Sequence, residues 1–321
     1  MSGGTATLLP RRPLGRTGLN VSELGFNAWV VGGGCCADAF DPGPGEARDE
    51  ESLAAMAKAF ELGVNFVVTA DSYGQGRSEI LVGKAIKSSP RLVHVATQVG
   101  WIRRDPEPAR PDFSPGYLRA ACDRSLNRLG VTRVDLYLLQ RPPREALADE
   151  SVWNVLRELK DSGKIAHFGV SLDDPADGLP VMERGEVAAL DVRYSLGCTQ
   201  AAQILFAEAE KRGVGILVRE PLAGGLLTGR FAEARELPEH DSRRRRYSRE
   251  RLEAALALAA RLRSLAQGGR TAAQCALRFA LAPLAVSCVT VGARNAEQAA
   301  EDFTASAVAE LTPEELARCA G

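Results

Sequence analysis

The chain has 321 residues, 45% of them hydrophobic, which is enough for one large core or two ordinary domains. Its 40 basic and 41 acidic residues leave a formal net charge of −1, so neither nucleic acid nor an anionic membrane surface is an expected partner. No apolar run approaches the roughly 20 residues of a membrane span, and the N-terminus has no signal-peptide pattern.

Strand and helix patterns alternate along nearly the whole chain, after a short hairpin pattern at Arg12–Val21. Near-continuous apolar runs predict eight buried strands, at Leu24–Trp29, Asn65–Thr69, Leu92–Thr97, Val134–Leu139, His167–Ser171, Ala189–Arg193, Gly215–Arg219 and Val286–Val291. Helical spacing lies between and after them, at Glu51–Leu62, Arg77–Lys87, Pro115–Leu129, Ser151–Ser162, Pro175–Glu183, Thr199–Arg212, Thr271–Leu281 and Ala296–Phe303.

This alternation predicts a fold of the α/β class, a closed (β/α)8 TIM barrel of parallel strands. The hairpin would close the amino-terminal mouth of the barrel, and a helix at Arg249–Leu265 would be an extra one in the loop after the seventh strand. No solenoid repeat and no Gly/Pro-rich linker divides the chain, so we expect a single domain over residues 1–321, with residues 1–10 flexible.

Two long loops interrupt the pattern, at Val30–Asp49 and Thr228–Ser248. Loops longer than about 15 residues are usually functional or disordered. The second loop contains the arginine run Arg243–Arg246, which we interpret as solvated loop charge, with contact to a phosphate as the alternative.

The seven cysteines lack the paired spacing of metal ligands, and the three histidines share no spacing. We therefore expect reduced thiols in a cytoplasmic protein, without a metal site.

The most informative stretch is Phe66–Gly76. Its first four residues are β-branched or aromatic, as in a strand buried on both faces, and helical spacing resumes at Arg77. Tyr73 should therefore lie on a loop just past the carboxyl end of a strand, which is where α/β barrels carry out their chemistry.

Six motifs, in this order, resemble the aldo-keto reductases over about residues 12–303. They are Pro-Leu-Gly-Arg-Thr-Gly at 13–18, Thr-Ala-Asp-Ser-Tyr-Gly at 69–74, Gly-Arg-Ser-Glu at 76–79, Gly-Lys-Ile at 163–165, Pro-Leu-Ala-Gly-Gly-Leu-Leu-Thr-Gly at 221–229 and Gly-Ala-Arg-Asn at 292–295. The resemblance implies the barrel fold and an NADP(H) site, but activity depends on the site residues and not on the barrel.

The resemblance implies carbonyl reduction by an aspartate, a tyrosine, a lysine and a histidine. The tyrosine protonates the carbonyl oxygen, and because a free phenol has a pKa near 10 it needs a nearby cation, the lysine, to act at neutral pH. Tyr73 matches the tyrosine, whereas Val68, Gln98 and Gln140 occupy the places of the aspartate, lysine and histidine. With three of the four positions substituted, reduction by the family route is not expected.

The positions that the resemblance assigns to the nicotinamide also differ. Ser171 is kept but lacks the asparagine that normally follows, Asp191 stands in place of a glutamine, and Arg219-Glu220 replaces an aromatic residue and a serine. The phosphate and adenosine end is better preserved, because a Gly-Gly turn can bring amides to a pyrophosphate and an arginine can face a 2′-phosphate. The expected cofactor-binding residues are Ser171, Leu222, Gly224, Gly225, Leu227, Arg294, Asn295 and Gln298; Asp302 replaces a usual asparagine at this end.

The substituted positions carry polar residues that would meet at the carboxyl ends of different strands. The predicted catalytic set is Tyr73, Gln98, Gln140, Arg219, Glu220 and Asp191. Tyr73 would be the acid–base group, the two glutamines and Arg219 would bind substrate, and one of the two carboxylates would be a second base. Arg219 or Arg141 is the expected cation beside Tyr73.

Structural interpretations stay open for the same residues. Gln98 and Gln140 could hydrogen-bond each other where a lysine and a histidine meet in the family. The charged residues Asp191, Arg193, Arg219 and Glu220 could form a buried ion-pair network without a catalytic role.

Three functional hypotheses follow. The first is a redox-neutral elimination, cyclisation or isomerisation of a small polar substrate in specialised metabolism, with NADP(H) retained as a structural piece, used in an internal redox cycle, or lost. The second is an atypical NADP(H)-dependent oxidoreductase acting on a carbonyl or alcohol. The third is a non-catalytic barrel that binds a ligand.

Overall fold

The computed structural model describes residues 9–33, 47–104, 107–233, 236–237, 243–244 and 247–320. Several expectations lie outside these residues. They concern most of the segment 1–10, the centre of the first long loop with Cys35 and Cys36, and much of the second long loop with Arg245 and Arg246.

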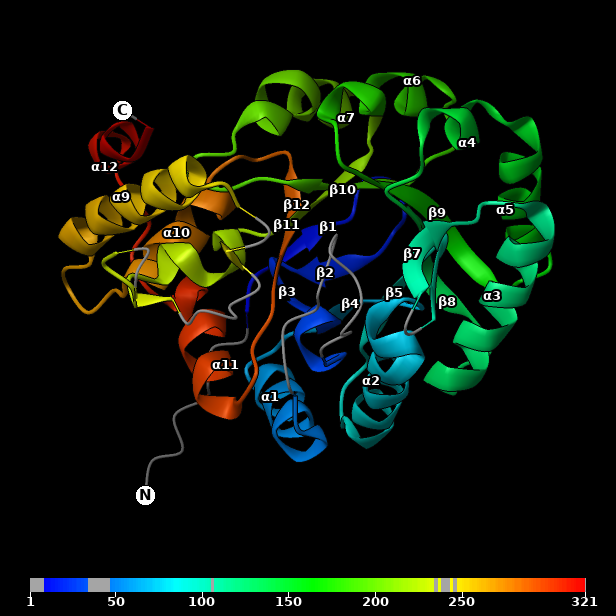
Figure 1. Cartoon of the computed structure of the whole chain (residues 1–321), viewed down its shortest axis with the longest axis horizontal. Helices are drawn as coiled ribbons and strands as arrows, with labels where there is room; N and C mark the ends of the chain where they lie inside the picture. The colour runs from blue at the N-terminus through cyan, green and yellow to red at the C-terminus, as the bar shows by residue number, and fades with distance from the viewer. Residues whose placement is uncertain are drawn as a thin grey trace.

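Eight parallel strands close into a barrel in the order β10-β11-β12-β3-β4-β5-β8-β9 (Figure 1). Their bounds are β3 Leu24–Asn27, β4 Phe66–Ala70, β5 His94–Val99, β8 Val134–Gln140, β9 Ile165–Leu172, β10 Ala189–Arg193, β11 Gly215–Arg219 and β12 Val286–Val291. Each corresponds to one of the predicted strands, so the TIM-barrel prediction is confirmed.

Helices surround the barrel in Figure 1 and cover the outer faces of its strands. Their bounds are α1 Asp49–Glu61, α2 Arg77–Ser88, α3 Pro115–Leu129, α4 Arg144–Ala148, α5 Glu150–Asp161, α6 Gly178–Glu183, α7 Ala207–Arg212, α9 Arg249–Leu265, α10 Ala272–Leu281, α11 Ala296–Phe303 and α12 Pro313–Ala320. Short helical turns are η1 Ala28–Val31, η2 Tyr73–Gly76, η3 Pro175–Asp177, η4 Ala202–Phe206, η5 Ala223–Thr228 and η7 Ala305–Ala307. Helix α9 is the extra helix predicted between the seventh and eighth barrel strands.

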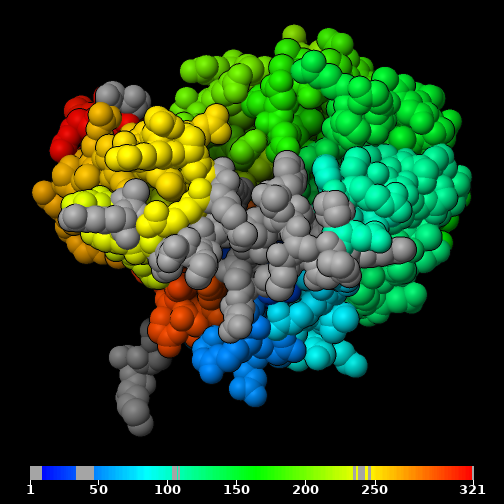
Figure 2. Space-filling model, in the orientation of Figure 1, coloured from blue at the N-terminus to red at the C-terminus, as the bar shows by residue number. Residues whose placement is uncertain are grey.

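Three elements were not predicted. They are a second hairpin after β5, made of β6 Trp101–Arg104 and β7 Glu107–Pro111, the short helix α4, and the C-terminal helix α12. Helix α12 packs against α9, and Figure 2 shows these two segments side by side at the left of the molecule. None of the helices in the described ranges is long and apolar enough to cross a membrane.

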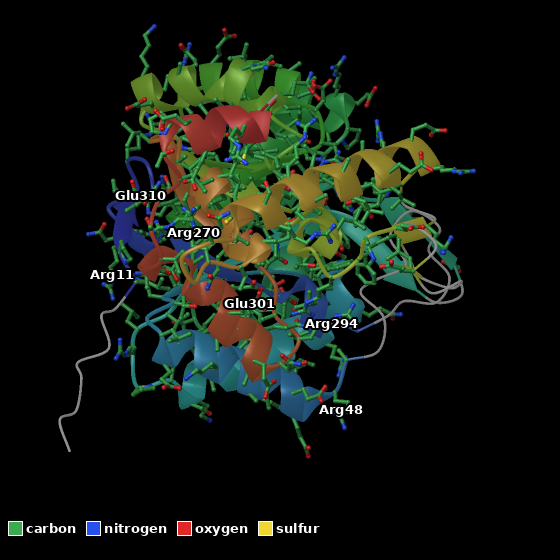
Figure 3. The ribbon with its side chains drawn as sticks, turned by 90° about the vertical axis from the view of Figure 1, so that its left-hand side faces the viewer. Arg11, Arg48, Arg270, Arg294, Glu301 and Glu310 are labelled. Atoms are coloured by element: carbon green, nitrogen blue, oxygen red, sulfur yellow. The ribbon has the colours of Figure 1, made fainter. Side chains whose placement is uncertain are left out.

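The hairpin of β1 Arg11–Pro13 and β2 Asn20–Ser22 closes one end of the barrel. Leu14 and Val21 are fully buried and pack with interior side chains of the barrel such as Phe66. The Arg16 amide donates to the Gly213 carbonyl at 2.8 Å, just before β11 begins. The hairpin therefore closes the amino-terminal mouth, as predicted. The opposite mouth carries the loops that follow the strands, and Figure 3 shows Arg11 and Arg294 at these two ends.

Candidate functional site

Tyr73 lies where the sequence predicts it, three residues past the end of β4 and half-buried at the carboxyl-terminal mouth. The loop is fixed on both sides. The Asp71 amide donates to the Gln98 carbonyl at 3.0 Å, and the Ser72 hydroxyl donates to Gln140 Oε1 at 2.9 Å. Gly32 packs so closely that a Cβ there would lie 3.0 Å from the Tyr73 carbonyl carbon. The structure thus holds Tyr73 in a defined position.

The floor of this mouth is a hydrogen-bonded group of buried polar side chains around Asp191. One carboxylate oxygen, Asp191 Oδ2, accepts from the Ser171 hydroxyl at 2.7 Å and from Gln98 Nε2 at 3.1 Å. All three residues are buried, so these bonds replace lost hydration. Burial raises the pKa of Asp191, against the opposing effect of the Arg219 guanidinium.

The interpretation that Gln98 and Gln140 hydrogen-bond each other is wrong. Gln98 donates to Asp191, and Gln140 accepts from Ser72. The reason is strand register: Gln98 on β5 pairs with Leu138 on β8, so Gln140 lies two residues farther along, about 7 Å closer to the mouth.

Arg219, at the end of β11, is the central cation of the site. Its Nη2 donates to the Leu172 carbonyl at 2.6 Å and to Asp173 Oδ1 at 3.1 Å, its Nη1 donates to Glu220 Oε1 at 3.4 Å, and its Nε lies 3.6 Å from Asp191 Oδ2. Burial alone would lower the pKa of Arg219, but the surrounding carboxylates raise it, and Tyr73 is close enough to contribute. The guanidinium therefore bridges the ends of β9, β10 and β11 beside Tyr73.

The predicted charged set does form a connected ion-pair network, with one additional member. Arg193 joins it through Asp173, whose Oδ1 lies 3.5 Å from Arg193 Nη2. Asp173 was missed because it follows β9 as an ordinary loop aspartate, and nothing in the sequence places it beside two arginines.

Lysine is absent from this mouth. All six lysines of the chain fall within its described part: five lie on outer helices and one lies immediately before β9, at the opposite end of the barrel. They are Lys58, Lys84, Lys87, Lys160, Lys164 and Lys211. The cation near Tyr73 is thus a guanidinium, which stays charged at every physiological pH.

Four non-glycine residues in the described ranges have positive φ: Gln75 at 55°, Arg141 at 46°, Glu220 at 58° and Ala223 at 48°. All four follow the carboxyl end of a barrel strand. Such conformations cost on the order of 1–3 kcal/mol each and tend to cluster at functional sites. Their position indicates that the loops of the mouth keep a defined backbone conformation although these four residues are strained.

The predicted phosphate-binding turn is present at η5. Gly224 and Gly225 have φ of 65° and 86°, and the Gly225 and Leu227 amides donate to the Leu222 carbonyl at 2.9 and 3.1 Å. Arg243 Nη1 donates to the Gly224 carbonyl at 3.4 Å and would lie 3.6 Å from a Cβ at Gly225. A close backbone approach beside a guanidinium suits a pyrophosphate. The structure thus brings at least one residue of the arginine run to this turn.

Asn295 and Gln298 form the N-terminal cap of α11. Asn295 Oδ1 accepts from the Gln298 amide at 2.9 Å, and Gln298 Oε1 accepts from the Arg294 amide at 3.0 Å. This role accounts for both side chains without a ligand. Arg294 lies at the same helix end (Figure 3). Farther along α11, burial raises the pKa of Asp302 to about 7.

The nicotinamide end fits the cofactor less well than the phosphate end. Leu172 replaces the asparagine that follows the serine in the family that the sequence resembles, and the Ser171 hydroxyl donates to Asp191. The Gln98 amide also binds Asp191, and Arg219 is held by the Leu172 carbonyl. Each of these three side chains thus donates to an acceptor within the protein, either Asp191 or the Leu172 carbonyl.

Behind the Tyr73 loop, Asp71 is buried between β4 and helices α2 and α3, and it accepts from the Tyr117 hydroxyl at 2.9 Å. Nothing in the sequence indicates this contact, since 46 residues separate the partners. Burial, together with the nearby Glu79 carboxylate, raises the pKa of Asp71 to about 7. Glu79 is itself paired with Arg128.

We expect Asp71→Asn to stabilise the protein at alkaline pH. The unfolded aspartate loses its proton near pH 4 and the folded one near pH 7, so the wild-type free energy of unfolding falls as pH rises between these values and stays low above them. About three pH units correspond to at most about 4 kcal/mol. Asparagine keeps an acceptor for Tyr117 and removes the titration.

Thermal melts of the wild type and the variant should therefore coincide near pH 4 and separate near pH 8. The matched control is Asp161→Asn, at an exposed aspartate ending α5, which should change neither melt. Equal shifts at both pH values would show that the Asp71 carboxyl is not the titrating group.

Among the described residues, no group of three or more histidine, cysteine or acidic side chains could hold a metal ion. The five described cysteines are free; four are buried and Cys198 is exposed.

Comparison with known proteins adds three findings. A model of the aldo/keto reductase family matches residues 32–321. Among curated proteins, the chain is 30% identical over 218 residues to a probable aldo-keto reductase 1 of Glycine max, covering 68% of this chain but 60% of that protein's length. It is 30% identical over 230 residues to the NADH-specific methylglyoxal reductase of Escherichia coli strain K12, covering 68% of both.

The same fold is found among solved structures. The glycerol dehydrogenase AKR11B4 of Gluconobacter oxydans superposes with a TM-score of 0.81 at 26% identity, covering 96% of this chain and 93% of that one. The structural similarity thus extends over nearly the whole length of both chains.

Proposed function

Because the chain belongs to the aldo/keto reductase family, we propose that it uses the family barrel for redox-neutral proton transfer. The reaction would be an elimination, cyclisation or isomerisation of a small polar substrate, with Tyr73 as the acid–base group. Gln98, Gln140 and Arg219 would line the substrate site, and a carboxylate of the same mouth would act as a second base.

The observation that carries this proposal is the kind of cation beside Tyr73. Arg219 is fixed by three carboxylates and a backbone carbonyl, and Tyr73 lies within its electrostatic reach. The interaction is mutual, so the guanidinium stabilises a phenolate at Tyr73. A guanidinium does not release its proton near neutral pH, so Tyr73 has to exchange protons with substrate and solvent rather than with a neighbouring ammonium.

The nicotinamide end supports the redox-neutral reading. Ser171 and Gln98 both donate to Asp191, so a bound carboxamide would compete with Asp191 for these donors. The proposed proton transfer uses no nicotinamide. Bound at the η5 turn, NADP(H) would supply hydride chemistry, and this chain's part would be to hold the phosphates with Arg243 and Arg294.

The second candidate is an NAD(P)(H)-dependent oxidoreductase acting on a carbonyl or alcohol. It is favoured by the glycine turn with Arg243 beside it, and by the relatives named as a methylglyoxal reductase and a glycerol dehydrogenase. For this candidate, losing the activated proton donor should cost about 10²–10⁴ in rate.

Titration of the tyrosines by ultraviolet absorbance tests the Tyr73–Arg219 interaction directly. Burial raises the pKa of Tyr194 to about 12, and those of Tyr117 and Tyr137 are raised too. In a Tyr247→Phe background, the titration that a further Tyr73→Phe substitution removes is that of Tyr73. We expect Arg219→Gln to move this titration upward by about one pH unit, since an opposite charge nearby favours the ionised form.

Arg219→Lys keeps a cation and should leave the Tyr73 titration close to that of the wild type, which separates the effect of charge from the loss of packing. An unchanged titration in Arg219→Gln would remove the basis of the proposal. In parallel, NADPH oxidation with phenylglyoxal or 4-nitrobenzaldehyde should stay at least about 10²-fold below that of relatives with an intact tetrad. Turnover at the relatives' rates would establish the oxidoreductase instead.

A further inference from the structure

We propose that Glu220 is the second base, and that the substrate is a neutral carbonyl compound from which Glu220 removes a proton on the carbon next to the carbonyl group. The inference rests on the proposed function and names its substrate class and its base. The carbonyl oxygen would lie against Tyr73 and Arg219.

The two candidate carboxylates differ in burial. Asp191 is buried, and its Oδ2 already accepts two hydrogen bonds, so it positions Ser171, Gln98 and Arg219. Glu220 keeps 23% of its side chain exposed and pairs with Arg219 through a different nitrogen, Nη1, at 3.4 Å. A base must pass its proton on to solvent, and the partly exposed Glu220 can do so more readily than Asp191, whose side chain is 2% exposed.

The backbone at Glu220 is consistent with a functional position. Its φ of 58° is one that glycine would adopt without strain. Glutamate at this position costs stability, and the left-handed conformation turns the chain directly after Arg219 so that the carboxylate stays beside the guanidinium.

A donor for the substrate oxygen is present in the same group. Arg219 Nε is buried and makes no hydrogen bond; its nearest carboxylate oxygen, Asp191 Oδ2, is 3.6 Å away and occupied by Ser171 and Gln98. Buried N–H groups are nearly always satisfied. Together with the Tyr73 hydroxyl, this donor suits an oxygen that gains negative charge during the reaction.

The charges around Arg219 favour a neutral substrate. Asp173, Asp191 and Glu220 face two guanidinium groups, those of Arg219 and Arg193. The group is thus close to neutral or slightly negative, and a substrate with a full negative charge would meet fixed carboxylates. With a neutral carbonyl, negative charge develops on the oxygen only during proton transfer. Arg219 would then stabilise the transition state more than the bound substrate, which is what accelerates a reaction.

The step is balanced without an oxidant or reductant. The C–H bond next to the carbonyl breaks, its proton moves to Glu220, and its electron pair forms the carbon–carbon double bond of the enolate. The carbonyl π pair moves to oxygen, where Tyr73 and Arg219 donate hydrogen bonds. Return of a proton from Glu220 restores the ketone, so in heavy water the substrate gains deuterium.

The test is deuterium exchange into hydroxyacetone and dihydroxyacetone, both neutral, followed by proton NMR in heavy water with nucleotide-free protein. We expect exchange above the buffer rate in the wild type and a loss of about 10²-fold or more in Glu220→Gln. Glu253→Gln, an exposed carboxylate on α9, is the matched control and should exchange as the wild type does.

Glu220→Gly suits the positive φ and should fold; added formate should restore part of its exchange. If Glu220→Gln retained exchange while Asp191→Asn lost it, Asp191 would be the base and the proposal would be overturned. Retention of exchange in Glu220→Gln would by itself also overturn it. The absence of wild-type exchange with both ketones would also overturn it. That result would leave the proposed function standing if the Tyr73 titration still depends on Arg219.

Discussion

Replacing Gln98 by lysine should raise the NADPH-dependent reduction of phenylglyoxal by about 10²-fold or more. Gln98 Nε2 lies 3.1 Å from Asp191 Oδ2, so a lysine side chain at this position would bring its ammonium against that carboxylate. Asp191 would then hold the lysine, a role that the buried, apolar Val68 cannot fill. The ammonium would favour proton release from the neighbouring phenol of Tyr73.

Gln98→Met is the control, because it fills a similar volume without charge or hydrogen bonding. NADPH binding is measured for each variant by fluorescence quenching, so that a change in affinity is separated from a change in turnover. A lysine variant that reduces phenylglyoxal no faster than the methionine variant would mean that the missing ammonium does not limit the reaction.

The barrel could be predicted from the sequence because each of its strands is a short apolar run, buried on both faces, followed by a helical pattern. The β6–β7 hairpin could not. Its strands, Trp101–Arg104 and Glu107–Pro111, carry charges and prolines and lie outside the barrel, so they have the composition of a loop. Hydrophobic periodicity indicates burial, and none of the side chains of this hairpin whose burial is described is buried.

Most residues of the site could be predicted from the sequence, but their hydrogen-bond partners could not. The position of Tyr73 follows from one strand and one turn, which are local features. The partner of Gln98 depends instead on the register of β5 against β8 and on the reach of Asp191 across the barrel from 93 residues away. Asp173 and Tyr117 could not be predicted for the same reason, because each contacts its partner over 46 residues of sequence.

The hydrogen bonds around Asp191 explain why buried residues of the mouth are polar. Asp191 is buried, and without donors its carboxylate would be costly. Ser171, Gln98 and Arg219 supply those donors. Replacing any one of these three residues by an apolar one would leave the Asp191 carboxylate with fewer partners. The cost in stability should therefore come mainly from the buried charge of Asp191.

Arg219→Met should accordingly destabilise the protein by about 3–5 kcal/mol near pH 8, because it leaves the buried Asp191 carboxylate without its cation. Burial already raises the pKa of Asp191, and losing Arg219 removes the main opposing effect, so its pKa should rise further. A folded-state pKa above the unfolded value makes stability fall as pH increases. The loss should therefore be smaller near pH 5 than near pH 8.

Urea unfolding at both pH values measures the effect, and the double variant Arg219→Met/Asp191→Asn isolates its origin. Asparagine carries no charge and still accepts from Ser171 and Gln98, so the double variant should recover most of the stability and lose the pH dependence. If the two substitutions were simply additive, the cost would come from the packing of Arg219 or from its bonds to Leu172 and Asp173. The buried charge pair would then not be what holds these strand ends together.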